Sequence, residues 1–306
     1  MKDLKIVFMG TPDFAVPSLD ILVRHGYNIV GVVTAPDKPR GRGQVLSPSP
    51  VKEYALSKNL FVMQPTNLKS PEFASQLKSL GVNLQVVVAF RMLPESVWSL
   101  PKYGTFNLHA SLLPQYRGAA PINWAIINGE KETGATTFFI THEIDTGAII
   151  LQEKETIEDD ETAGSLHDKL MIKGAALVLE TVKRIESGDV RPAPQDMSQA
   201  VKPAPKIHKE TCKIDWNKPA REVYNFIRGL SPYPAAWTVI NGCLYKIFQS
   251  EILDEDRPGM KPGELATDNE SYMKFKTADK LLSIKEFQKE GKKRMDVKAF
   301  FRGNKL

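Results

Sequence analysis

The chain has 306 residues, of which 42% are hydrophobic and 25% are charged, and its formal net charge is +5. These values favour a globular protein large enough for two domains. No apolar run reaches the roughly 18 residues of a membrane span. The opening MKDLKIVFMG does not read as a signal peptide. We therefore expect a cytoplasmic protein with no membrane partner.

Apolar strands alternate with helices through the first 188 residues. In chain order, the patterns predict strands at 4–9, 28–35, 60–64, 84–90, 104–110, 135–141 and 148–156, and helices at 15–25, 51–59, 70–81, 121–129 and 162–187. Near-continuous apolar strands between helices indicate an α/β, Rossmann-like and mostly parallel sheet. Ligands of such sheets bind at the carboxyl ends of the strands.

The chain changes character after residue 188. Residues 189–208 are rich in proline and lack periodicity, which predicts an interdomain linker. A helix is expected at 218–230, followed by short strands at 235–242, 243–253, 271–277 and 280–288. This spacing predicts a C-terminal antiparallel β-barrel of the OB-like type. The expected domains are thus 1–188 and 209–306.

Basic residues are concentrated in two places. Residues 1–208 carry 22 basic and 22 acidic side chains, whereas residues 209–306 carry 19 and 14. The loop 35–50 adds Lys38, Arg40 and Arg42 against Asp37. Two basic elements suit a polyanion such as nucleic acid, although an ordinary solvated surface would look the same.

Polar side chains that could take part in catalysis lie near the end of the predicted strand 104–110. Asn107 and His109 are two residues apart, so they share one face of that strand. Asp145 lies in a turn, Asp-Thr-Gly, between two apolar segments, and it is a natural partner for the imidazole of His109. The set lacks a good nucleophile. We therefore expect it to activate a bound acyl donor toward an external nucleophile.

Several other kinds of site are poorly supported by the sequence. G-x-G-x-x-G and Walker-type motifs are absent, which argues against dinucleotide and ATP chemistry. Cys212 and Cys243 form no disulfide framework, and neither they nor the remaining histidines have metal-site spacing. We expect no metal.

The stretch NLHASLLPQYRGAAPINWA, together with IDTG, resembles the folate-dependent formyltransferases. The segments MGTPDFAVPSL, PDKPRGRGQVLSPSPVK, VVVAF and KIDW, and the closing basic segment, extend the resemblance over nearly the whole chain. They are similar to the branch of that superfamily that acts on methionyl-tRNA. Arg91 departs from the pattern, in which many relatives have glycine after the strand.

The resemblance implies a role for each matched segment. It implies 10-formyltetrahydrofolate as formyl donor, the amino group of methionine on initiator tRNA as acceptor, and a monomeric chain. By residue, it implies catalysis by Asn107, His109 and Asp145, folate binding by Ser111, Leu112, Leu113 and Pro114, tRNA binding by Lys38, Arg40, Arg42 and Lys206, and a methionine side-chain pocket at Phe14.

Two alternative functions remain open at this point. One is a formyltransferase with a small acceptor, either a sugar nucleotide or glycinamide ribonucleotide. The other is a non-catalytic RNA-binding protein. The basic C-terminal third argues against the first, because a small acceptor does not need it. The buried polar trio argues against the second, because burying it without use is costly.

Overall fold

The computed structural model describes residues 3–40, 45–199 and 202–306. Its contacts divide the chain into two compact units. The first comprises Met1–Gly118, Gly134–Glu155 and Asp168–Pro203, and the second comprises Ala119–Thr133, Thr156–His167 and Ala204–Leu306. Two segments from the middle of the sequence therefore fold together with the C-terminal residues.

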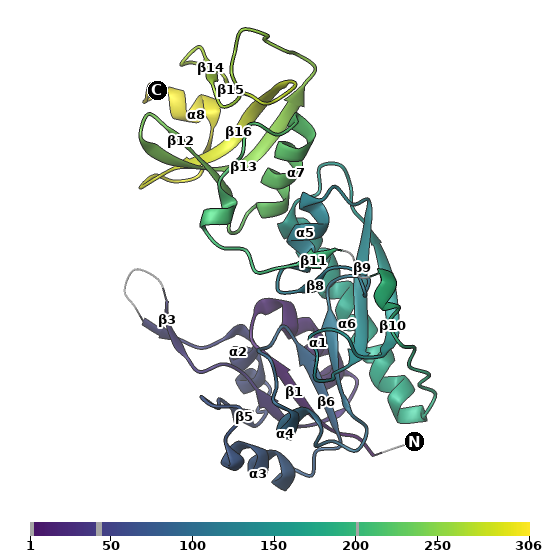
Figure 1. Ribbon diagram of the computed structural model, residues 1–306. Helices are drawn as coiled ribbons and strands as arrows, with labels where there is room; N and C mark the ends of the chain where they lie inside the picture. The colour runs from purple at the N-terminus through teal and green to yellow at the C-terminus, as the bar shows by residue number, and fades with distance from the viewer. Residues whose placement is uncertain (1–2, 41–44, 200–201) are drawn as a thin grey trace. The chain divides into compact units, whose positions relative to one another are not determined.

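A seven-stranded sheet forms the first unit, with the strand order β10-β9-β7-β6-β1-β2-β5 (Figure 1). Strands β1, β2, β5, β6 and β7 run parallel, and β9 is antiparallel to β7. The bounds are β1 (Lys5–Gly10), β2 (Asn28–Val33), β5 (Val62–Met63), β6 (Leu84–Val88), β7 (Thr105–His109), β9 (Glu132–Phe139) and β10 (Ile149–Thr156). The predicted α/β fold is confirmed.

Helices connect these strands, and short hairpins and turns complete the first half of the chain. They are α1 (Val16–Arg24), α2 (Pro50–Ser57), α3 (Pro71–Ser79), α4 (Glu95–Trp98), α5 (Pro121–Ile127) and α6 (Ala163–Ser187), with the shorter elements η1 (Asp13–Ala15), β3 (Lys38–Arg40), β4 (Val45–Ser47) and β8 (Arg117–Gly118).

Local sequence explains where several helices begin. The side chain of Ser49 accepts a hydrogen bond from the backbone N–H of Lys52 at the start of α2. Ser70 does the same for Phe73 in α3, and a proline follows each serine at the first helical position. Serine caps satisfy an otherwise unpaired backbone donor, and proline there loses no helical hydrogen bond. Ser70 therefore marks the start of the helix predicted at 70–81.

Strand β7 presents different side chains to its two faces. Phe106 and Leu108 are buried, and Leu108 packs against α6 so closely that a Cβ at Gly174 would lie 2.7 Å from it. Asn107 and His109 alternate with them and therefore face the opposite side of the sheet. From β1, the chain adds β2 and β5 on one side of the sheet and then β6 and β7 on the other. Ligands of such sheets bind at the carboxyl ends of the strands beside this switch point, so the edge near β6 and β7 is the expected place for a ligand.

The second unit is built on an antiparallel sheet with the order β12-β13-β16-β15-β14, to which β17 adds beside β16 (Figure 1). It forms an OB-like half-barrel, as predicted. The remaining elements are η2 (Met197–Gln199), β11 (Pro203–Ala204), η3 (Glu210–Cys212), α7 (Ala220–Leu230), β12 (Ala236–Ile240), β13 (Cys243–Leu253), β14 (Leu265–Thr267), β15 (Met273–Lys276), β16 (Leu281–Lys289), β17 (Met295–Asp296) and α8 (Val297–Phe301).

Helix α7 joins the inserted segments of the second unit to its core. Gly229 lies so close to α5 that a Cβ would be 2.6 Å from the side chain of Ile127. Arg228 is 5% exposed and donates to the backbone oxygens of Glu158 and Glu161 at 3.1 and 3.0 Å. A buried guanidinium needs such acceptors. This contact ties residues 156–167 to the helix.

The segment expected as a loop contains regular structure, and the C-terminal basic segment contains a helix that was not predicted. Residues 38–47, expected as part of a loop, include the β3–β4 hairpin. The hairpin base is braced by Asp37, which accepts from Lys52 at 2.7 Å and from Gln64 at 2.8 Å. The C-terminal basic segment, residues 285–305, contains helix α8, whose first turn is capped by the side chain of Asp296. Both elements are too short to be recognised from periodicity.

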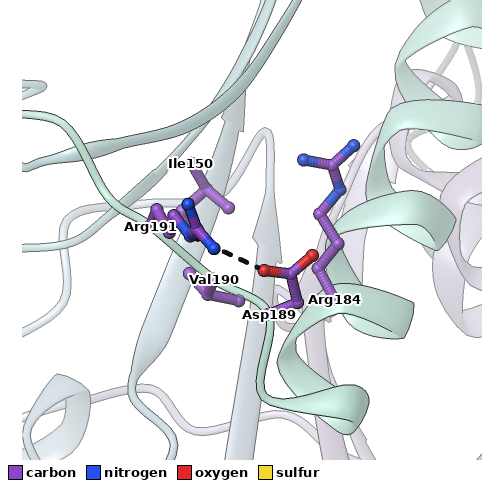
Figure 2. Close-up of a pocket in the computed structure, with 5 residues that line it drawn as sticks. All are labelled: Ile150, Arg184, Asp189, Val190 and Arg191. Atoms are coloured by element: carbon purple, nitrogen blue, oxygen red, sulfur yellow. Dashed lines mark ion pairs between the residues drawn. The ribbon is translucent and has the colours of Figure 1, made fainter.

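A pocket of about 350 Å³ lies in the first unit, lined by Ile150, Arg184, Asp189, Val190 and Arg191 (Figure 2). It contains none of the residues predicted for the functional site. Arg191 faces Asp189, and Arg184 pairs with Glu180 one helical turn away. Among the described helices, none is both long and apolar enough to traverse a bilayer.

Candidate active site

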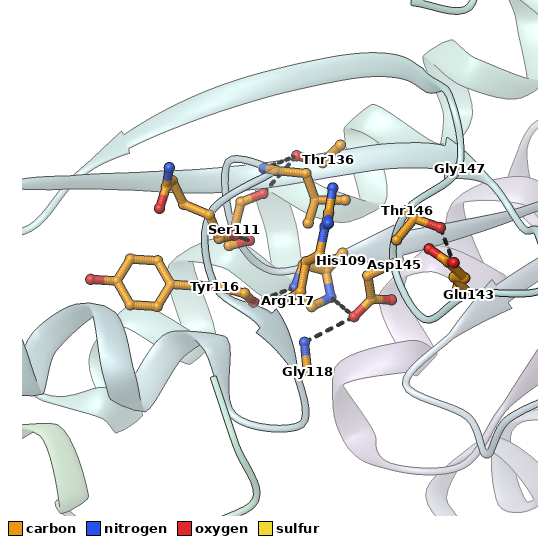
Figure 3. Close-up of polar contacts among 12 residues, drawn as sticks. His109, Ser111, Tyr116, Arg117, Gly118, Thr136, Glu143, Asp145, Thr146 and Gly147 are labelled. Atoms are coloured by element: carbon orange, nitrogen blue, oxygen red, sulfur yellow. Dashed lines mark hydrogen bonds and ion pairs between the residues drawn. The ribbon is translucent and has the colours of Figure 1, made fainter. Parts of the chain in front are cut away.

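His109 lies at the carboxyl end of β7 and is 6% exposed. Its Nε2 is 2.8 Å from the backbone oxygen of Tyr116. Because a carbonyl oxygen only accepts, this hydrogen bond requires the hydrogen to be on Nε2. The other ring nitrogen, Nδ1, lies 3.8 Å from Oδ2 of Asp145 (Figure 3). Both ring nitrogens are thus directed at protein oxygens.

Asp145 reaches His109 from the loop between β9 and β10. Its Oδ2 also accepts a hydrogen bond from the backbone N–H of Gly118 at 2.9 Å. The 3.8 Å to the imidazole is beyond hydrogen-bonding distance, so the two groups form an ion pair only when the ring is protonated. Asp145 has a φ of 55°, in the left-handed region, so the loop carries local strain at this point.

Asn107 precedes His109 by two residues on the same face of β7 and is partly exposed. It pairs in register with Val87 and Phe138 on the neighbouring strands. Within the described residues, its side-chain amide makes no hydrogen bond. The amide is therefore a donor available to a ligand at the edge of the sheet.

The segment after β7 is fixed by hydrogen bonds to its backbone. Thr136 Oγ1 donates to the oxygen of Ser111 at 2.6 Å and accepts from the N–H of Leu113 at 3.1 Å. Gln152 donates to the oxygen of Leu113 at 2.8 Å. The Ser111 hydroxyl turns inward to the oxygen of Gln115. The segment is thus a braced wall, and Ser111 does not point outward as a nucleophile would.

Leu112 and Pro114 complete this segment. A Cβ at Gly134 would lie 2.6 Å from the Leu112 side chain and 2.1 Å from the oxygen of Glu153, so only glycine fits there. Pro114 follows a cis peptide bond and is partly buried.

Phe14 lies in η1, the turn that follows β1, and is 7% exposed. Arg91 turns its guanidinium toward the backbone oxygens of Pro65 and Thr66. The cation is therefore held by the loop after β5.

The residues predicted to bind tRNA are distributed over both units. Lys38 and Arg40 belong to β3 of the first unit, where Lys38 is exposed. Arg42 lies outside the described residues. Lys206 belongs to the second unit and is exposed. The catalytic candidates all lie in the first unit.

Lys206 lines a pocket of about 420 Å³ that lies within the second unit. Lys209 and Lys246 also line it, and none of its described lining residues is acidic. Tyr233, 81% exposed, and Trp237 provide aromatic surface. Positive charge beside exposed rings suits phosphates and bases of a nucleic acid.

Sequence reasoning missed the side chains that brace the site. Thr136 and Gln152 stand in strands whose patterns gave no sign of this role. Gln195 lies in the expected linker, yet it is 8% exposed and contacts both Arg117 and the Asp145 loop. Arg117 was visible only as part of the matched motif. Contacts between distant segments have no local sequence signal.

The structure gives little support for a reactive cysteine or for a metal site. Burial raises the pKa of the Cys212 thiol, which disfavours the reactive thiolate. Among the described residues, no group of three or more His, Cys, Asp or Glu side chains could hold a metal ion.

Comparison with known families accounts for both units. A family model described as formyl transferase matches residues 4–182, and a model of the formyl transferase C-terminal domain matches residues 206–305. The chain belongs to the formyl transferase family. The braced segment 111–114, His109 and Asp145 all lie within the N-terminal match.

Individual members of the formyl transferase family resemble the chain over its full length. The methionyl-tRNA formyltransferase of Bacteroides thetaiotaomicron is 54% identical over 313 residues, covering 100% of this chain and 97% of that protein. That of Flavobacterium johnsoniae is 51% identical, covering 99% and 97%. The crystal structure of an N-formyltransferase from Helicobacter canadensis, solved with folinic acid and dTDP-3-aminofucose, has a TM-score of 0.68 at 24% identity. It covers 92% of this chain and 98% of that one, and shows the shared fold.

Proposed function

We propose that this protein transfers a formyl group from 10-formyltetrahydrofolate to the α-amino group of methionine on initiator methionyl-tRNA. The observation that carries the proposal is the full-length similarity, above 50% identity, to methionyl-tRNA formyltransferases. The similarity includes residues 206–305, in which the chain's excess positive charge lies.

Asn107 and His109 would stabilise the formyl oxygen as the amine attacks the formyl carbon. The bond from that carbon to N10 of the donor then breaks, and tetrahydrofolate leaves with a proton on N10. The amide of Asn107 is a ready donor, because no described residue uses it. The Nε2–H of His109 is engaged by the oxygen of Tyr116, so the formyl oxygen has to replace that carbonyl as acceptor. Losing one donor of this kind costs about 3–4 kcal/mol of barrier.

Asp145 would orient His109 and help to accept the proton that the attacking amine loses. Its Oδ2 is held by the N–H of Gly118 and faces Nδ1 of the imidazole. A carboxylate there can orient the ring and accept this proton, directly or through water, before the proton passes to the departing tetrahydrofolate. Positioned acid–base groups contribute roughly a hundred- to ten-thousand-fold in rate.

The folate donor would lie along the braced segment formed by Ser111, Leu112, Leu113 and Pro114. Thr136 and Gln152 hold the backbone of this segment before any ligand arrives, so binding costs little ordering of the chain. Phe14 would supply apolar surface to the methionine side chain.

The tRNA would engage both units. Lys38 and Arg40 of β3, together with Arg42, would contact the acceptor end. Lys206 would act with Lys209 and Lys246 in the aromatic pocket of the second unit. Phosphate neutralisation by such groups makes binding strongly salt-dependent.

Formylation assays distinguish this function from the alternatives. The test measures transfer of labelled formyl from 10-formyltetrahydrofolate to charged initiator tRNA, with charged elongator tRNA and a sugar nucleotide as parallel acceptors. Rapid transfer to initiator tRNA alone supports the proposal. Transfer to the sugar nucleotide alone would replace it with the small-acceptor activity. RNA binding without turnover, unchanged in His109→Ala, would indicate a non-catalytic protein.

A further inference from the structure

The segment expected to be a linker contributes directly to the first unit. Ala193 and Ile149 exchange two backbone hydrogen bonds, of 2.9 and 2.8 Å. These bonds fix the segment against the first residue of β10, a few residues beyond Asp145. Gln195 follows two positions later, and its side chain is buried.

The side chain of Gln195 bridges two loops of the candidate site. Its Nε2 donates to the backbone oxygens of Asp145 and Gly147, at 2.9 and 2.8 Å. Its Oε1 accepts from Nε and Nη2 of Arg117, at 3.2 and 2.5 Å. A glutamine amide offers two donor hydrogens and one oxygen with two lone pairs, so these four contacts use its full capacity. A saturated, buried amide braces its surroundings and has nothing left for a substrate.

Both loops that Gln195 joins have strained backbone. Tyr116, Gly118 and Asp145 have φ values of 59°, 120° and 55°, and two of these residues are not glycine. Such conformations persist only when surrounding contacts impose them, and they are frequent at functional sites. Arg117 lies between the first two, and Gln195 contacts Arg117 and the carbonyl of Asp145 at once.

These loops also supply the contacts that set His109. The oxygen of Tyr116 receives the Nε2–H of His109, and the N–H of Gly118 holds the carboxylate that faces Nδ1. A shift of either loop would move one side of the imidazole's environment. Misplacement of reacting groups by about 1 Å can cost roughly a hundred-fold in rate.

We propose that Gln195 is a positioning residue that holds the carboxylate of Asp145 opposite His109 by clamping the loops 116–118 and 145–147 together. The inference rests on the proposed function, since the roles of His109 and Asp145 belong to it. The segment after α6 is then part of the active-site framework of the first unit.

The hydrogen-bond pattern requires an amide at this position. Gln195→Glu would keep an acceptor for Arg117 but would place a carboxylate oxygen against two backbone oxygens. Gln195→Ala would remove all four contacts. Both variants should have a lower kcat than the wild type, and Gln195→Glu should not restore the activity that Gln195→Ala loses, although glutamate has the same shape as glutamine. Full activity of Gln195→Glu would show that the two donated bonds are dispensable.

A double-mutant cycle tests whether Gln195 acts through Asp145. We expect Gln195→Ala to lower kcat roughly 10- to 100-fold, with KM for folate donor and tRNA changed less than about threefold. In an Asp145→Asn background, the same change should lower kcat less than about threefold. Equal losses in both backgrounds, or no loss in the wild-type background, would overturn the proposal.

Gln85→Ala is the matched control. Gln85 is also a buried glutamine of the first unit, and its Oε1 accepts from Thr105 at 2.8 Å within the sheet. Removing it costs one buried hydrogen bond and leaves the two loops untouched. It should therefore leave kcat of the folded protein unchanged.

A readout independent of turnover separates this proposal from the proposed function. The imidazole ¹⁵N resonances of His109 can be recorded in the full-length protein without substrate. We expect Gln195→Ala to move them as Asp145→Asn does, and Gln85→Ala to leave them in place. If the wild-type protein formylates no tRNA, the proposed function is refuted, but these spectra still test whether Gln195 positions Asp145 opposite His109. If the His109 resonances do not move in Gln195→Ala, the positioning role of Gln195 is refuted.

Discussion

The backbone N–H of Gly118 donates to Oδ2 of Asp145 at 2.9 Å, although the two residues are 27 positions apart in the sequence. The same carboxylate oxygen lies 3.8 Å from Nδ1 of His109. One oxygen therefore links the loop after β7 to the end of β7 itself. The arrangement depends on the Asp145 loop keeping its left-handed turn.

Asp145→Asn should separate the charge of this side chain from its shape. Asparagine can still accept from Gly118, but it cannot stabilise a charged imidazole. We expect kcat for formyl transfer to fall roughly a hundred- to ten-thousand-fold, with KM for tRNA nearly unchanged. Steady-state kinetics with charged initiator tRNA measure both. A rise in KM with unchanged kcat would place Asp145 in substrate binding.

Gly147→Ala should disrupt the loop that carries Asp145. A Cβ at this position would lie 1.6 Å from the backbone oxygen of Phe139, a contact that only backbone movement can relieve. We expect a loss of about 1–3 kcal/mol in unfolding free energy together with a fall in kcat. Gly259→Ala is the control, since a Cβ at that position would meet nothing within 4 Å. Equal stability of the two variants in urea unfolding would contradict the packing argument.

Tyr233→Ala and Lys246→Gln should weaken tRNA binding through the pocket of the second unit. Removing a stacking ring costs about 1–3 kcal/mol per base, so KM for tRNA should rise at least roughly five-fold. Loss of one phosphate contact should reduce the slope of log Kd against log salt by about one. Folate KM should stay constant. Lys183→Gln, an exposed lysine on α6, serves as the charge-matched control. Unchanged tRNA binding in both pocket variants would remove the RNA role of this pocket.

Tyr27→Phe should make the protein less sensitive to alkali. Burial, reinforced by Glu186, raises the pKa of Tyr27 from 10.0 to about 12, so the folded state keeps a proton that the unfolded chain loses. This contribution to stability is complete below the unfolded pKa and is lost as the pH rises through the folded one. Urea unfolding from about pH 9 to about pH 12 should show a smaller decline for the variant. Parallel declines for variant and wild type would contradict the assignment.

Much of the architecture followed from local pattern. The apolar runs around Phe8, Val32 and Val86 predicted the parallel strands, because a strand buried on both faces must be apolar along its length. The serine at position 70 and the glycines after helices set helix ends through local hydrogen bonding and positive φ. Some short elements, such as β14 and α8, escaped prediction because they carry too few side chains for a period to appear.

The sequence by itself determined the strand that carries Asn107 and His109, the face they share, and the motif that marks the formyl transferase family. The tertiary structure alone decided that Asp145 faces the imidazole of His109 and that Gly118 and Gln195 hold the Asp145 loop. It also decided that residues 119–133 and 156–167 fold with the C-terminal unit. The physical reason is range: periodicity and capping act over a few residues, whereas these contacts join segments brought together only when the sheet and its loops pack.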